Sequence, residues 1–139
     1  MKFEFSAGGI VFKKEGGLIQ ILVSQHSQHH GWVFPKGIIG DKEKSESKET
    51  TALREVKEET GVEGKILKPI KPVEYWYVME GEKIKKTVYY FLMEYIGGSI
   101  EDHDNEMENV EWLPMDAVEA RLTYKADKEA WQEALNLIK

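Results

Sequence analysis

The segment REVKEETGV, residues 54–62, places three carboxylates on one face of a predicted helix that stops at Gly61. At about 100° per residue, Glu55, Glu58 and Glu59 fall within an arc of roughly 100°. Three like charges this close repel one another, and a divalent cation removes the repulsion because hard cations bind carboxylate oxygens. The spacing therefore predicts a metal site on a helix, and such a metal indicates phosphate chemistry.

The length and composition of the chain are those of one globular domain, residues 1–139. Hydrophobic residues make up 41% of the chain and charged residues 32%, and a chain of this length can bury roughly two-thirds of its unfolded surface. The formal net charge is −6, which argues against binding of duplex nucleic acid or an anionic membrane. An anionic substrate would therefore depend on metal ions and nearby lysines for positive charge.

The chain has no cysteine, which excludes disulfides, thiolate catalysis and cysteine–zinc sites. No stretch approaches the roughly 18 apolar residues of a membrane span, and the first residues do not have the pattern of a signal peptide. These features lead us to expect a cytoplasmic protein without a membrane partner. The oligomeric state stays open between a monomer and a homodimer.

The order of apolar and turn-forming segments predicts an α+β sandwich. Ser47 can cap the start of a helix, and Gly61 suits the left-handed position after its end. The predicted helix spans residues 48–60, and a second amphipathic helix is predicted over residues 125–138. Strands are predicted over residues 3–13, 18–23, 32–34, 62–78, 84–95 and 110–113.

The region around the acidic helix resembles the Nudix box, G-x5-E-x7-R-E-U-x-E-E-x-G-U, in which U is a bulky apolar residue. The matching residues are Gly40, Glu46, Arg54, Glu55, Val56, Glu58, Glu59, Gly61 and Val62. Few unrelated sequences would match so many fixed positions, so the chain is similar to Nudix hydrolases across residues 40–62. The resemblance implies a Nudix-type α/β/α sandwich with a mixed central sheet.

One feature departs from the usual Nudix pattern. In many Nudix proteins the box glycine closes a Pro-Lys-Gly tripeptide, but here Pro35-Lys36-Gly37 lies three residues before Gly40. We favour Gly37 as the equivalent glycine, because the preceding strand fixes where the chain exits and a loop absorbs an insertion at small entropic cost. Gly40 stays the alternative because it matches the signature literally.

The resemblance also implies a metal site. Glu55, Glu58 and Glu59 would hold Mg²⁺, with Mn²⁺ as the alternative ion, together with a backbone carbonyl of Gly37 or Gly40. Such an ion offsets phosphate charge and lowers the pKa of a bound water, which then attacks phosphorus.

Five residues are the candidate catalytic group: Glu46, Arg54, Glu55, Glu58 and Glu106. Arg54 is expected to pair with Glu46 or with a box carboxylate and to orient it. The proton acceptor stays open among Glu55, Glu58 and Glu106, because the sequence does not show which carboxylate reaches the attacking water.

Two aromatic segments, residues 75–77 and 83–90, point to the substrate. Their rings can stack on a nucleobase and their lysines can contact phosphates, although tyrosines in strands usually fill a core and lysines usually face water. The pattern is similar to that of bacterial Nudix enzymes that cleave diadenosine tetraphosphate. The candidate substrate-binding residues are Lys36, Tyr75, Tyr77, Lys86, Tyr89 and Tyr124. The four histidines show no clear metal-ligand spacing.

These observations predict magnesium-dependent hydrolysis of a phosphoanhydride bond in a small-molecule nucleotide. The favoured substrate is a dinucleoside polyphosphate such as diadenosine tetraphosphate. Alternatives are ADP-ribose, a nucleoside triphosphate, an inositol pyrophosphate, a capped RNA end, or a sensor module that binds nucleotide without turnover. The three intact glutamates of the box argue against the sensor.

Overall fold

The computed structural model describes residues 1–40 and 44–138. Its strands are β1 (Lys2–Glu15), β2 (Leu18–His26), β3 (Trp32–Val33), β4 (Lys36–Ile38), β5 (Val62–Pro69), β6 (Val73–Met79), β7 (Glu82–Gly98) and β8 (Met107–Pro114). Its helices are α1 (Lys48–Thr60), α2 (Val118–Arg121) and α3 (Lys125–Ile138), with short 3-10 turns at Ile100–Asp102 and Met115–Ala117. No helix among the described residues is long and apolar enough to cross a membrane.

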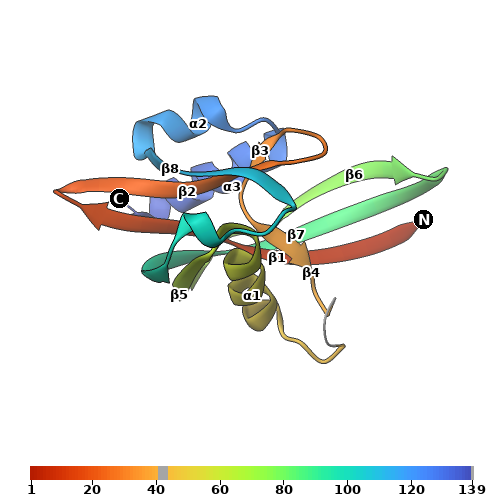
Figure 1. Cartoon of the computed structure of the whole chain (residues 1–139). Coiled ribbons are helices and arrows are strands. Elements are labelled where there is room, and N and C mark those ends of the chain that lie inside the picture. Colours follow the sequence, from red (N-terminus) through yellow and green to blue (C-terminus); the bar gives the residue numbers. More distant parts are fainter. Residues whose placement is uncertain (41–43, 139) are drawn as a thin grey trace.

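The strands form one mixed sheet with β1 at its centre. β1 is parallel to β7 and antiparallel to β2 and β4, while β7 is antiparallel to both β5 and β6. β3 and β8 complete the sheet through β2. Helix α1 lies on one side of this sheet, and α2 and α3 lie on the other (Figure 1). The expected α/β/α sandwich with a mixed central sheet is confirmed.

Helix α1 has the bounds that its capping residues predict. The Ser47 side chain accepts a hydrogen bond from the backbone of Thr50, and Gly61 follows the helix in the left-handed conformation. Ala52 and Val56 face the sheet and belong to the buried cluster beneath α1. This packing fixes the rotation of the helix and therefore the direction of its carboxylates.

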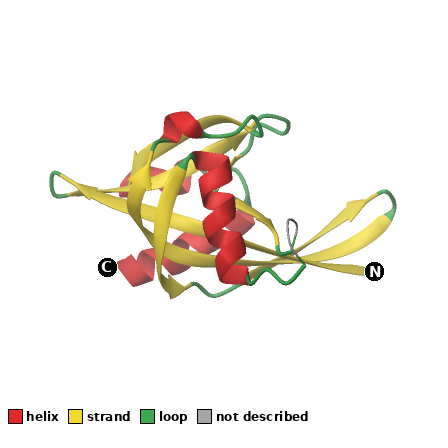
Figure 2. Cartoon of the chain, turned by 60° about the horizontal axis from the view of Figure 1, so that its bottom comes forward, coloured by secondary structure: helices red, strands yellow, loops and turns green. Residues whose placement is uncertain are grey.

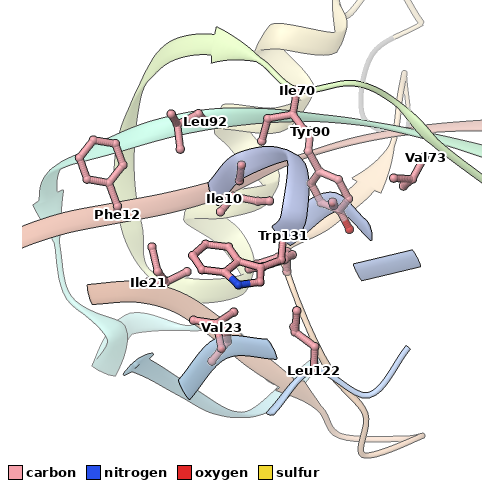
Figure 3. Packing of buried hydrophobic residues seen from close by; sticks show 14 of the residues in the cluster. Ile10, Phe12, Ile21, Val23, Ile70, Val73, Tyr90, Leu92, Leu122 and Trp131 are labelled. Carbon is pink, nitrogen blue, oxygen red and sulfur yellow. The ribbon is translucent and has the colours of Figure 1, made fainter. Parts of the chain in front are cut away.

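A second buried cluster lies between the sheet and α3. Trp131 projects from α3 toward Ile10 and Ile21, as Figure 3 shows, and is almost fully buried. Tyr90 of β7 and Leu122 border the same cluster. Each face of the sheet thus has its own hydrophobic core, and both cores hold the central strands in place.

The sequence predicts a long or bent strand over residues 62–78 that is broken by Pro69 and Pro72, and the structure is interrupted at that place. The structure has two strands, β5 and β6, separated by Ile70–Pro72. Pro69 and Pro72 lack the N–H groups that a continuous ladder requires. Ile70 is buried and donates its N–H to the carbonyl of Tyr90, so the chain turns into the core between the two strands.

The first part of β1, β6 and the first part of β7 extend beyond the helices as three paired strands (Figure 2). Register places Glu4, Lys86 and Tyr75 in one row on one face, and Phe3, Lys85 and Trp76 in the next row on the opposite face. We call this part of the sheet the strand extension. One face of the strand extension forms a wall of the candidate site.

Candidate active site

The acidic part of the site comes from α1 and β4. Glu55 and Glu59 are buried and line a cavity of about 300 Å³, together with Gly37. The Glu58 side chain is 39% exposed and does not line this cavity. The other residues that line the cavity are His26, His29, Val33, Phe34, Lys36, Ile38, Lys86, Glu106 and Met107.

Glu55 and Glu59 are held close together in the interior. Burial raises the pKa of both carboxyl groups, most strongly that of Glu59, and the charge of each neighbouring glutamate adds to the effect. Two carboxyl groups with raised pKa values this close together disfavour carrying charge at the same time. A divalent cation at this position would remove that repulsion.

Arg54 binds Glu46 with one edge of its guanidinium, through two parallel hydrogen bonds. Nε lies 2.8 Å from Oε2 of Glu46, and Nη2 lies 2.8 Å from Oε1. This fork-like pair, with a hydroxyl hydrogen bond from Thr51, lowers the pKa of Glu46 to about 2. The remaining nitrogen, Nη1, donates to Glu55 at 3.2 Å and to Glu58 at 3.1 Å. Arg54 therefore contacts both kinds of carboxylate that the sequence offered as its partner.

The structure distinguishes the two candidate glycines. A methyl group on Gly37 would overlap the carboxylate of Glu55, so a larger residue there would displace that carboxylate from its position. The backbone of Gly40 instead contributes a hydrogen bond that helps to lower the pKa of Glu46. Gly37, and not Gly40, is the glycine placed against the buried carboxylates.

The three box glutamates do not converge on one point. In the described part of the chain, no three histidine, aspartate or glutamate side chains form a ready-made metal site. Glu58 turns toward Arg54, whereas Glu55 and Glu59 turn toward the cavity. These donors still fit a hard cation, because they are carboxylate oxygens and the backbone of β4 passes close to them at Gly37.

Glu106 lies on the loop side of the same cavity. Its Oε1 is 3.8 Å from Nε2 of His26, and its charge is one of the influences that raise the pKa of Glu59. Its backbone N–H donates to Asp104 at 3.0 Å, which anchors the turn that carries it. The acidic loop thus brings one carboxylate of several into the site.

An aromatic cavity of about 540 Å³ adjoins the acidic one. Tyr75 and Tyr77 of β6 line it with ring centres 6.3 Å apart, and Tyr124 lies at the start of α3. Lys36 and Lys86 line both cavities. The other residues that line the aromatic cavity are His29, Val33, Val73, Val88, Tyr90, Lys125, Ala126 and Asp127.

Tyr89 is the one candidate substrate residue that the structure places elsewhere. Neighbouring strand residues face opposite sides of a sheet, so Tyr89 points away from the cavity that Tyr90 lines. Its ring packs against the core beneath α1, with Nζ of Lys48 4.8 Å from the ring centre. The expectation that Tyr89 contacts substrate is therefore corrected: it supports α1.

His29 is a candidate residue that the sequence did not reveal. Its Nδ1 accepts hydrogen bonds from the backbone of Gly31 at 3.0 Å and from the hydroxyl of Tyr124 at 2.9 Å. Burial, with the nearby charges of His26 and Lys36, lowers the pKa of His29, which favours the neutral ring. The proton then sits on Nε2. The only signal in the sequence was a histidine-rich loop before a short strand.

Asp127 was also missed. It is buried at the wall of the aromatic cavity, where it accepts hydrogen bonds from the backbone of Phe34 and the hydroxyl of Tyr90, both at 3.3 Å. Burial raises the pKa of its carboxyl group. In the sequence it is one polar residue in an amphipathic helix, so nothing local marks it.

Residues 2–135 match the NUDIX domain family, and the chain belongs to this family. It is 36% identical to the putative mutator protein MutT4 of Mycobacterium tuberculosis, over 97% of this chain and 56% of that protein. It is 28% identical to an 8-oxo-(d)GTP phosphatase of Mycolicibacterium smegmatis, over 80% of this chain and 32% of that protein. The chain thus spans about half or less of the length of these curated relatives.

Solved structures share the fold. A C. elegans Ap4A hydrolase in a binary complex superposes with a TM-score of 0.75 at 19% identity, covering 97% of both chains. The NUDIX domain of Shewanella oneidensis NrtR, complexed with ADP ribose, superposes with a TM-score of 0.77 at 21% identity, covering 100% of this chain and 90% of that one. At these low sequence identities, the likeness shows a shared fold only.

Proposed function

We propose that this chain is a metal-dependent Nudix hydrolase that cleaves a phosphoanhydride bond in a nucleoside polyphosphate. One observation carries the proposal: an aromatic cavity and an acidic cavity adjoin, and Lys36 and Lys86 line both. A nucleoside polyphosphate has the same two parts, a flat base that stacks on rings and a chain of anionic groups. The two lysines lie where the first phosphates would follow the sugar.

The residues divide the chemical work among them. Glu55 and Glu59, the carbonyl of Gly37 and, after a turn away from Arg54, Glu58 would hold the metal ion. When bound, Mg²⁺ or Mn²⁺ supplies charge compensation for the phosphates and lowers the pKa of a water. Lys36 and Lys86 bind the phosphate chain as point charges.

Glu106 is the carboxylate that we assign as proton acceptor for the attacking water. It lines the acidic cavity opposite Glu55 and Glu59 and has no arginine partner among the described residues. Glu55 and Glu58 both accept a hydrogen bond from Arg54, so both are engaged before substrate arrives. A proton acceptor needs a free oxygen within reach of the water.

A dinucleoside polyphosphate is the substrate that the aromatic cavity favours. Tyr75 and Tyr77 form one wall and Tyr124 lies on another element, which suits a base held between rings. The fold shared with an Ap4A hydrolase agrees with this assignment. The hydrolysis would split the polyphosphate into two mononucleotides, one of which takes the oxygen of water.

A nucleoside triphosphate is the second candidate. It is favoured by the similarity to MutT4 and to an 8-oxo-(d)GTP phosphatase. Hydrolysis would then release a shorter nucleotide with phosphate or pyrophosphate. The products therefore separate the two substrates.

The test is a panel of dinucleoside polyphosphates, nucleoside triphosphates including oxidised guanine nucleotides, and ADP-ribose. Products would be identified by mass spectrometry after incubation with Mg²⁺, with Mn²⁺, or with a chelator. We expect turnover of one nucleotide class that stops when metal is removed, and ¹⁸O-labelled water would show which phosphorus is attacked. Nucleotide binding without any product over prolonged incubation would contradict the proposal and favour a sensor.

A further inference from the structure

We infer that Glu4 is a positioning residue that couples recognition of the base to recognition of the phosphates, an inference that rests on the proposed function. Glu4 lies on β1 in the strand extension. Its Oε1 is 2.9 Å from Nζ of Lys86 and accepts a hydrogen bond from the hydroxyl of Tyr77, also at 2.9 Å. One carboxylate on β1 therefore holds side chains from β6 and β7 together.

Glu4 acts through these two partners. Tyr77 lines the aromatic cavity, and Lys86 lines both the aromatic and the acidic cavity, whereas Glu4 lines neither. The side chains of Glu4 and Lys86 are only 17% and 14% exposed, and Glu4 lies behind the cavity surface to which Lys86 contributes. A ligand that contacts the Tyr77 ring and the Lys86 ammonium meets two groups whose positions depend on the same carboxylate.

The electrostatics agree with a formed ion pair. Burial by itself would raise the pKa of Glu4, but the hydrogen bond and charge of Lys86 and the Tyr77 hydroxyl outweigh it and lower the pKa. A lysine has a long flexible stem, and an ammonium without its partner can adopt several rotamers. Glu4 thus reduces the freedom that Lys86 and Tyr77 would otherwise lose on binding substrate.

The same strands provide a matched control on their other face. Glu74 of β6 and Lys85 of β7 form a pair at 3.7 Å, and their side chains are 56% and 31% exposed. Neither residue lines a described cavity next to the box. Replacing Glu74 removes the same charge from the same strand extension without changing a residue that lines the aromatic cavity.

The experiment compares Glu4→Gln with Glu74→Gln. Glutamine keeps an oxygen for Tyr77 but loses the charge that holds Lys86. For the best nucleotide substrate we expect Glu4→Gln to raise KM by about three- to tenfold, with kcat within about twofold of wild type. Glu74→Gln should leave both constants unchanged. Thermal unfolding of each variant would show that it is folded.

A binding measurement without catalysis separates coupling from a general loss of structure. Calorimetric titration in chelator would compare ADP, which has a base, with inorganic triphosphate, which has none. We expect Glu4→Gln to weaken ADP binding by about three- to tenfold. Triphosphate should change less, because it has no base to contact Tyr77 and so depends on only one of the two side chains that Glu4 holds.

Three results would overturn the inference: Glu4→Gln behaving like Glu74→Gln, a fall in kcat without a change in KM, or equal weakening of ADP and triphosphate. If Glu4→Gln does not fold, Tyr77→Phe tests the same contact, because it keeps the ring and removes the hydroxyl that Glu4 binds. Unchanged KM and unchanged ADP affinity in Tyr77→Phe would then count against it. A wild-type protein that turns over no nucleotide would instead overturn the proposed function.

Discussion

Arg54 holds Glu46 more firmly than it holds Glu55 or Glu58. Two of its nitrogens are bound to Glu46, while a single nitrogen is shared between Glu55 and Glu58. Glu46 therefore keeps the guanidinium in place whether or not the other contacts persist. A metal ion that recruits Glu58 needs to break only the contact to one shared nitrogen, which is a small change in geometry.

Replacing Glu58 tests the metal assignment. Glu58→Gln keeps the shape and removes one charge, so we expect kcat to fall by roughly 10²- to 10³-fold. Because the side chain is partly exposed, the melting temperature should change little. Turnover near that of wild type in a folded variant would contradict the assignment of Glu58 as a metal ligand.

Glu46 links the site to stability at acid pH. Its pKa is lowered from 4.5 to about 2 in the folded protein, first by the hydrogen bonds from Arg54. A carboxylate with a lowered folded pKa adds stability above its unfolded pKa, and this stability is lost as pH falls from 4.5 toward 2. Denaturant unfolding should therefore show Glu46→Gln to be less stable than wild type at pH 7, with the difference shrinking below pH 4.5. A difference that stays constant down to pH 3 would contradict this account.

The structural elements that the sequence predicts well are those defined by local signals. Helix α1 could be predicted because Ser47 and Gly61 define its ends within the sequence itself. Strand β4 was missed because its existence depends on pairing with β1, as Gly37 pairs with Ala7. Pro114 can open a helix, and a 3-10 turn and helix α2 do follow it, but the bounds of α2 could not be predicted because it has no side-chain cap.

The same distinction applies to the candidate site. The residues of the Nudix box lie in one continuous segment, so their spacing shows that they share a helix. Glu4, His29 and Asp127 come from three distant segments, and only the fold brings them to the cavities. Tyr89 was assigned to the wrong side because β7 is buried on both faces and its sequence does not show which face is which.

Helix α3 depends on one large side chain. Trp131 is buried between α3 and the sheet, beside Ile10 and Ile21 (Figure 3). Replacing it with alanine would leave a large cavity, so we expect Trp131→Ala to lower the free energy of unfolding by about 3–5 kcal/mol. Chemical denaturation would measure the loss, and Leu18→Ala, at an exposed position, is the control. A loss below about 1 kcal/mol would show that α3 is held mainly by other contacts.

In the whole molecule, the sheet lies between the two hydrophobic cores, and its strands contribute residues to both cavities. Helix α1 places Glu55 and Glu59 on one side of the sheet, and Tyr75 and Tyr77 of the aromatic cavity belong to the strand extension. The chain spans about half of the length of MutT4. The fold and both cavities are formed by residues within the matched domain.

The parallel pairing of β1 with β7 has a consequence for how the protein is made. Lys2 pairs with Ile84 and Phe12 with Glu94, so β1 cannot pair with β7 until residues 84–94 have left the ribosome, although β2 and β4 are available earlier. At about 5–20 residues per second, that wait lasts roughly 4 to 16 seconds. During this time the apolar first strand is open to aggregation or to chaperones, and neither cavity can exist before most of the polypeptide has emerged.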